Sequence, residues 1–193
     1  MQKRTIRKKA PARISVGAVG KFAPAVDTTT LLNANATDAA MLTKQNPLII
    51  KIAGGSTRER LVRQGKYSGH NALVARPAPR APQKEDQEFE CRIFHFDQII
   101  NSDDAARKMS NIDTRHPWKP ATIEHLLVLG ARMPHLQGQF PITALGTIFR
   151  NKGLSLVACL HHGDGPKRYV ILRWWGDDWC GDFAFLGVRK IIR

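Results

Sequence analysis

The sequence predicts an α+β fold, in which a small mixed sheet packs with helices, a disordered basic N-terminal arm precedes them and a C-terminal antiparallel β-rich part follows. Three observations support this prediction. Strand-like and helix-like segments alternate up to residue 133, four strand-like segments follow from residue 140, and the first twelve residues are basic. An apolar content of 42% in 193 residues is typical of a globular protein of one ordinary domain.

Residues 1–12 are expected to form the flexible basic arm, and residues 13–193 a single α+β domain. The arm ends near Pro11 and carries five cations that are candidates for binding nucleic acid: Lys3, Arg4, Arg7, Lys8 and Lys9. Weak alternation over 13–19 predicts a first strand. One or two short helices are expected within 28–43, where threonines precede Leu- and Ala-rich pieces.

The next strand is predicted over 47–53, because the segment is rich in β-branched residues and has a proline at its entrance. Two adjacent glycines end this strand. Ser56 or Thr57 is then suited to cap a helix over 58–64, and Gly65 is suited to end it.

A Pro-rich loop is expected over 66–88, because prolines at alternate positions are followed by a cluster of charges. Alternating side chains predict a strand over 90–96. The Ser-Asp-Asp sequence at 102–104 is suited to cap a helix that runs to about residue 112. Residues 121–133 then show the apolar spacing of an amphipathic helix.

The end of the sequence is rich in predicted strands, which are separated by turns containing Gly, Asn and Asp. The strands are expected over 140–149, 155–160, 169–175 and 182–189. Because their connections are short, an antiparallel meander is the simplest arrangement.

Tryptophans gather in this region at positions 174, 175 and 179, close to Phe183 and Phe185. Most of them are expected to pack in the core. Alternation along a strand places Trp174 and Trp175 on opposite faces, so one of the two is expected to be exposed. An exposed indole could stack on single-stranded bases.

Charge is the strongest global indication of function. The net charge is +14, and residues 1–80 hold 15 Lys/Arg against three acids, a net of +12. Binding of such a segment to a polyanion releases counterions, which favours nucleic acid as the partner. No apolar run has the length of a membrane span and no secretory signal is recognised, so a cytoplasmic protein with no membrane partner is expected.

The three cysteines are widely spaced and form no CxxC pair, so reduced thiols are expected rather than a disulfide framework. Two sets of side chains have metal-binding chemistry. A zinc set would need neighbouring strands to bring together Cys159, His161 and Cys180. Three carboxylates would suit Mg²⁺, although they lie in turns where Asp also serves local hydrogen bonding: Asp164, Asp177 and Asp178.

The stretch IIKIAGGSTRERL, residues 49–61, has the pattern of an anion site. A strand that ends in glycines and turns into a helix directs backbone N–H groups outward at the positive end of the helix dipole. An ordinary turn is the alternative, and the Walker A pattern is absent. The residues expected to contact phosphate or a nucleotide are Gly54, Gly55, Ser56, Thr57, Arg58 and Arg60.

The box from Gly54 to Arg58 resembles the GGxTR box of the ParB/sulfiredoxin superfamily, and residues 90–96 would be the strand that follows it there. The resemblance covers at most residues 13–97. It implies a small α/β fold that binds nucleotide or DNA phosphate at the box. The sulfiredoxin cysteine is absent, with Ser56 and Thr57 in this region instead, so sulfiredoxin chemistry is excluded.

The superfamily includes nucleases, nucleotide hydrolases and plasmid-encoded fertility-inhibition proteins. The resemblance therefore implies a DNA-binding protein of a plasmid or other mobile element that inhibits conjugative DNA transfer, with components of a conjugative secretion system as partners. It also implies metal-dependent DNase and ATPase activity, with Mg²⁺ and ATP as cofactors, but it identifies no catalytic or metal-binding residue. Two alternatives remain open: a non-catalytic basic nucleic-acid-binding or assembly protein, and a module that inhibits a partner protein.

Overall fold

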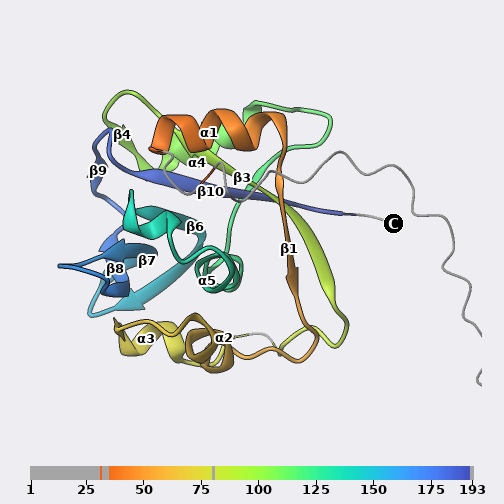
Figure 1. The fold of residues 1–193 in the computed structure, drawn as a ribbon, viewed down its shortest axis with the longest axis vertical. Helices are drawn as coiled ribbons and strands as arrows, with labels where there is room; N and C mark the ends of the chain where they lie inside the picture. The colour runs from red at the N-terminus through yellow and green to blue at the C-terminus, as the bar shows by residue number, and fades with distance from the viewer. Residues whose placement is uncertain (1–30, 32–34, 80, 192–193) are drawn as a thin grey trace, which may run out of the picture.

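The computed structural model describes residues 31, 35–79 and 81–191. Within them the chain is a mixed α+β structure built around one eight-stranded sheet, as the sequence predicts (Figure 1). None of the helices in these residues is long and apolar enough to cross a membrane. The predicted strand over 13–19 lies outside the described residues, as do the five cations of the arm: Lys3, Arg4, Arg7, Lys8 and Lys9.

Most elements follow one another along the chain with short connections, but residues 76–86 form a longer one between α3 and β3. The helices are α1 (Ala36–Gln45), α2 (Arg58–Gly65), α3 (Ala72–Ala75), α4 (Ser102–Asn111), α5 (Ile123–Arg132) and the 3₁₀ turn η2 (Leu136–Gly138). The strands are β1 (Leu48–Ile52), β2 (Gly69–His70), β3 (Gln87–His95), β4 (Ile100–Asn101), β5 (Lys119–Pro120), β6 (Ile142–Asn151), β7 (Leu154–His162), β8 (Arg168–Trp174), β9 (Asp178–Trp179) and β10 (Ala184–Lys190).

Local capping explains where the helices begin. The Thr57 hydroxyl accepts a hydrogen bond from the Arg60 amide at the start of α2, at 3.2 Å, as the sequence predicts. In α5, His125 lies three residues after the cap Thr122 and accepts that residue's amide, which is the reciprocal arrangement of a capping box. The helix expected within 28–43 is α1, and its cap is Asn35 rather than a threonine.

The sheet has the order β1-β3-β10-β6-β7-β8-β2, with β5 paired to β10. The predicted antiparallel meander is confirmed for β6, β7 and β8. The last strand departs from it, because β10 lies between β3 and β6 and pairs with β6 in parallel. Five consecutive residues of β10, 184–188, are buried, so this strand needs cover on both faces and takes a central place in the sheet.

The Pro-rich segment 66–88 is more ordered than the sequence predicts. It contains β2, which pairs with β8, and the short helix α3, and its last two residues already belong to β3. The Asn71 side chain caps α3 by accepting the Leu73 amide at 3.0 Å. Strands before and after this segment belong to the same sheet.

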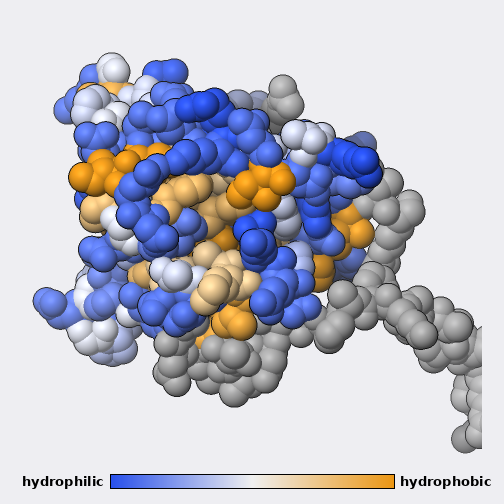
Figure 2. Space-filling view, turned by 90° about the horizontal axis from the view of Figure 1, so that it is seen from above, coloured by the Kyte–Doolittle hydropathy of each residue, from blue (hydrophilic) through white to orange (hydrophobic). Residues whose placement is uncertain are grey.

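Apolar side chains form two clusters. The larger one joins the sheet to α1, α2 and α5, and α5 buries seven of its ten residues. The smaller cluster contains Trp179, which is fully buried and donates from its indole nitrogen to the Ser102 hydroxyl at 2.8 Å. Trp174 is 51% exposed, so one of the two adjacent tryptophans is exposed, as predicted. The face seen in Figure 2 is mostly hydrophilic, with hydrophobic side chains only in small groups.

Candidate functional site

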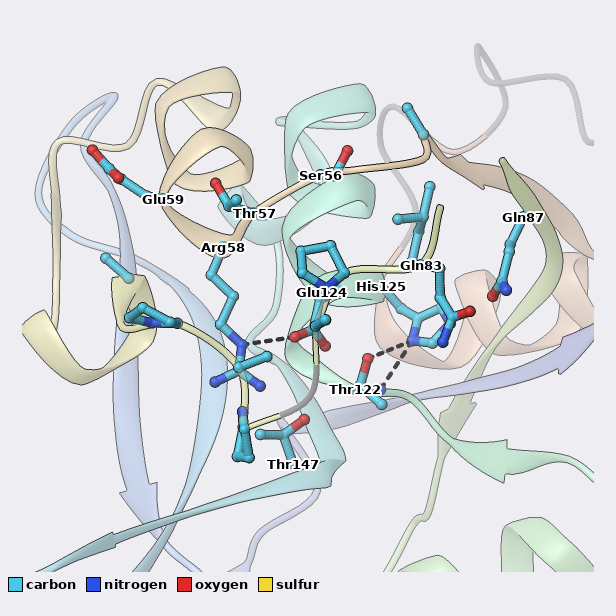
Figure 3. A pocket seen from close by; sticks show the side chains of 18 of the residues that line it. Ser56, Thr57, Arg58, Glu59, Gln83, Gln87, Thr122, Glu124, His125 and Thr147 are labelled. Carbon is cyan, nitrogen blue, oxygen red and sulfur yellow. Dashed lines mark hydrogen bonds and ion pairs between the residues drawn. The ribbon is translucent and has the colours of Figure 1, made fainter. Parts of the chain in front are cut away.

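A cavity of about 770 Å³ lies where the first turns of α2 and α5 meet the end of β1 and the start of β3 (Figure 3). This volume is within the range of about 300–1,000 Å³ that is usual for small-molecule sites. One wall is made of small and cyclic apolar side chains from the end of α3 and the segment that follows it: Ala75, Pro77, Ala78, Pro79, Ala81 and Pro82. The polar groups come mainly from the two helix starts.

The predicted phosphate-contacting residues divide into two groups. Three of them line the cavity: Ser56, Thr57 and Arg58. The amides of the glycine pair are instead hydrogen-bonded within the protein. Gly54 donates to an Asp86 carboxylate oxygen at 2.8 Å, and Gly55 donates to the Gln83 carbonyl at 2.7 Å. Arg60 is exposed on α2 and is not among the residues that line the cavity.

The backbone of the glycine pair therefore packs against the Pro-rich segment. Gly55 has a φ of 69°, which is in the left-handed region that favours glycine. A Cβ at Gly54 would lie 2.2 Å from the Lys84 carbonyl oxygen, so only glycine permits the two backbones to approach this closely. Asp86 also pairs with Lys51 at 2.6 Å, and these interactions lower the pKa of its carboxyl group. The turn thus fastens one end of the cavity wall.

Arg58 is the central charged group of the cavity. It is the first residue of α2, and side chains at a helix start point back past the end of the helix, which directs Arg58 into the cavity. Its side chain is 8% exposed and pairs through Nε with Glu124 at 2.7 Å. The guanidinium carbon lies 5.4 Å from the centre of the Phe149 ring. Figure 3 shows the two terminal nitrogens turned away from Glu124.

Glu124 remains a carboxylate in this partly buried position. Burial alone would raise its pKa, but hydrogen bonds from Thr122 and Arg58 and the positive charge of Arg58 together lower it. The pair is therefore ionised. The negative charge of Glu124 offsets the positive charge of Arg58. The pair therefore has no net charge, although the terminal nitrogens of Arg58 can still bind an anion.

His125 supplies a second polar group that is nearly buried, with 7% of its side chain exposed. Its Nδ1 accepts the Thr122 amide at 3.1 Å, so the neutral ring carries its proton on Nε2. Nε2 is buried and has no hydrogen-bond partner in the described part of the chain. The ring packs edge-to-face with Phe89, with their centres 4.3 Å apart. Burial lowers the pKa of His125 to about 4, so the ring is neutral at pH 7.

This pKa makes the stability of the protein depend on pH. Between about pH 4 and 6.5 the unfolded chain binds a proton at His125 that the folded chain does not, so stability is lost as the pH falls through this window. Between pH 7.5 and 5.0, the free energy of unfolding should fall by about 2 kcal/mol more in wild type than in His125→Gln. Urea unfolding at both pH values measures this. The control is His70→Gln, at an exposed histidine, which should lose as much stability as wild type between the two pH values. An equal loss of stability in wild type and His125→Gln would contradict the proposed burial of a neutral His125.

Sequence reasoning missed the half of the site that α5 and the sheet contribute: Phe89, Thr122, Glu124, His125, Thr147 and Phe149. The Thr-x-x-His cap at the start of α5 could have indicated these residues, since polar side chains in the first turn of a helix point toward the space beyond its N-terminal end. In the described residues no group of three or more His, Cys, Asp or Glu side chains is placed to hold a metal ion. Cys159 is buried while Cys180 is exposed, and Asp177 pairs with Arg173.

Chemically, the arrangement suits a ligand with an anionic group and a flat apolar part. The arginine fork and the start of α2 can bind the anion, because the amides of Arg58 and Glu59 have no carbonyl of their own helix to bind. The proline-rich wall and Phe89 offer flat apolar surfaces. Comparisons with protein-family models, curated proteins and solved structures found no match.

Proposed function

We propose that the protein binds a nucleotide phosphate, free or within a nucleic acid strand, in the cavity at the start of α2. One observation carries this proposal. Arg58 lies at the N-terminal end of α2 and is only 8% exposed, yet the two terminal nitrogens of its guanidinium point away from its ion-pair partner Glu124. An arginine fork binds a phosphate or carboxylate through two parallel hydrogen bonds. The helix dipole adds to this attraction.

The rest of the cavity is suited to the base and sugar of the same nucleotide. Pro77, Pro79, Pro82 and Phe89 provide flat apolar walls. Ser56 and Thr57 line the same cavity, and their hydroxyls can donate to phosphate.

DNA is the form of nucleic acid that we propose, in line with the resemblance to the ParB/sulfiredoxin superfamily. The net charge of +14 supports a polyanionic partner. In this proposal the protein acts in a plasmid or other mobile element and inhibits conjugative DNA transfer, with Mg²⁺ and ATP serving DNase and ATPase activities. Incubation with plasmid DNA or ATP, in Mg²⁺ and then in EDTA, tests the two activities.

The binding proposal is tested with Arg58→Ala, using Arg60→Ala as the matched control. Both variants remove one positive charge from the same helix, but only Arg58 lines the cavity. Titration calorimetry with ATP should show at least a tenfold loss of affinity in Arg58→Ala and less than a twofold loss in Arg60→Ala, since a charge-assisted bond contributes about 1.5–3 kcal/mol. Equal losses in the two variants would contradict a site at Arg58.

The second candidate is a non-catalytic basic protein that binds nucleic acid through its surface alone. The observation that favours it is a group of exposed cations on and just after α2: Arg60 and Arg63 on the helix, and Lys66 directly after its end. Replacing these three by alanine should abolish DNA binding if this candidate is right, while Arg58→Ala would leave DNA binding unchanged. The two proposals therefore predict opposite rankings of the same variants.

A further inference from the structure

Trp174, at the end of β8, is a large aromatic side chain that stays 51% exposed. Its indole lies against Gly176. A Cβ built on Gly176 would be 2.7, 2.9 and 2.9 Å from three consecutive ring atoms. Nearly equal distances to consecutive atoms arise when a ring is approached through its face, whereas an approach through the edge would leave one atom much closer than its neighbours. The glycine therefore supports one part of the ring face while half of the side chain remains in solvent.

The strand register connects this ring to the cavity. Trp174 pairs with Leu156 on β7, and Leu156 pairs with Phe149 on β6. Directly paired residues of antiparallel strands lie on the same face of a sheet, so these three side chains form one row. Phe149 is the ring against which the Arg58 guanidinium packs. With strands about 4.8 Å apart, Trp174 lies about 10 Å along the sheet from Phe149.

Leu154 extends this row into a strip. It precedes Leu156 by two residues on β7, so it lies on the same face and diagonal to Trp174, and it is 50% exposed. Scattered exposed hydrophobic residues are normal on a protein surface. Here, however, Leu154 and Trp174 are diagonal neighbours, and their row continues through a half-buried leucine to the ring that packs against Arg58.

We infer that the apolar strip of Leu154, Leu156 and Trp174 is a base-stacking platform for single-stranded nucleic acid. This inference rests on the proposed function, because it assumes that one phosphate of the bound nucleic acid strand is held by Arg58. The cavity walls enclose room for the base of that nucleotide, so Trp174 would receive the base of a neighbouring one. The net charge of +14 for the whole chain favours a polyanion over an apolar protein segment as the partner. Stacking needs a ring with one accessible face, whereas paired bases in a duplex are not available to it.

The test measures binding of a fluorescent oligo-dT strand, a duplex of the same length, and ATP. Trp174→Ala should weaken oligo-dT binding about tenfold, while Trp174→Phe retains most of the affinity, because base stacking on an aromatic ring survives in phenylalanine. ATP affinity and the melting temperature should not change in either variant. Ile112→Ala removes another half-exposed hydrophobic side chain, far along the sequence on the end of α4, and should not affect oligo-dT binding.

The outcomes separate this inference from the proposed function. Unchanged oligo-dT binding in Trp174→Ala, with a loss in Arg58→Ala, would overturn the platform and leave the phosphate site standing. Unchanged binding of both ATP and oligo-dT in Arg58→Ala would overturn the proposed function. Equal losses of duplex and oligo-dT binding in Trp174→Ala, or a change of oligomeric state in sedimentation, would also overturn the platform in favour of a general or a protein-binding surface.

Discussion

A Gly54→Val variant is expected to lose about 2–4 kcal/mol of its free energy of unfolding and to lose nucleotide binding as well. The added side chain would begin 2.2 Å from the Lys84 carbonyl oxygen and 2.8 Å from the Lys84 carbonyl carbon. Since both are backbone atoms, the segment cannot yield by rotating a side chain. It must move away, which breaks the bonds from Gly54 to Asp86 and from Gly55 to Gln83.

Loss of these bonds releases one end of the proline-rich wall, so the cavity should change together with stability. Chemical unfolding gives the first effect and ATP titration gives the second. Gly138→Val is the matched control, because a Cβ at Gly138 would meet no atom within 4 Å and its φ is not positive. A Gly54→Val protein as stable as this control would show that the close approach at Lys84 is not required.

Glu124→Gln should tighten ATP binding about tenfold, because it removes the negative charge next to the arginine that we propose binds the phosphate. Glutamine has the same shape and can still accept the Arg58 Nε–H. The same variant should be less stable without ligand, because Arg58 is then a nearly buried charge without a carboxylate partner. Affinity and stability therefore change in opposite directions, and a lesion that merely damages the fold would lower both.

Glu85→Gln is the control for this prediction. Glu85 is an exposed carboxylate in the segment that forms the cavity wall, but it does not line the cavity. Its removal should alter ATP affinity by less than twofold. If Glu124→Gln instead weakened ATP binding, Glu124 would be a ligand-contacting acceptor that needs its charge, and the role given to the ion pair would be wrong.

Elements with local signals were predictable from the sequence. The strand over 47–53, the helix over 58–64 and the helix over 121–133 correspond to β1, α2 and α5 within a few residues, since β-branching, caps and apolar spacing act within a few positions of the chain. The central place of β10 was not predictable in this way. It depends on pairing with β3, about ninety residues away in sequence, which no local pattern encodes.

In the candidate site, too, residues with a local signal were predictable and contacts between distant segments were not. Arg58 could be named from its position after a glycine turn, but its partner Glu124 lies 66 residues away, and the contact exists only once α2 and α5 have packed together. The need for Gly54 was also visible in the sequence. Its cause was not, because the group that approaches the glycine is the backbone near Lys84 rather than a ligand.

The most direct measurement of the central claim, a nucleotide phosphate bound by Arg58 at the start of α2, is an NMR titration of the ¹⁵N-labelled protein with ATP. We expect saturable shifts of the Arg58 Nε–H signal and of the Arg58 and Glu59 amide signals. The Gly54 and Gly55 amides should change little, because Asp86 and Gln83 hold them. Shifts confined to the exposed Arg60, Arg63 and Lys66, or no saturable shift at Arg58, would contradict the claim.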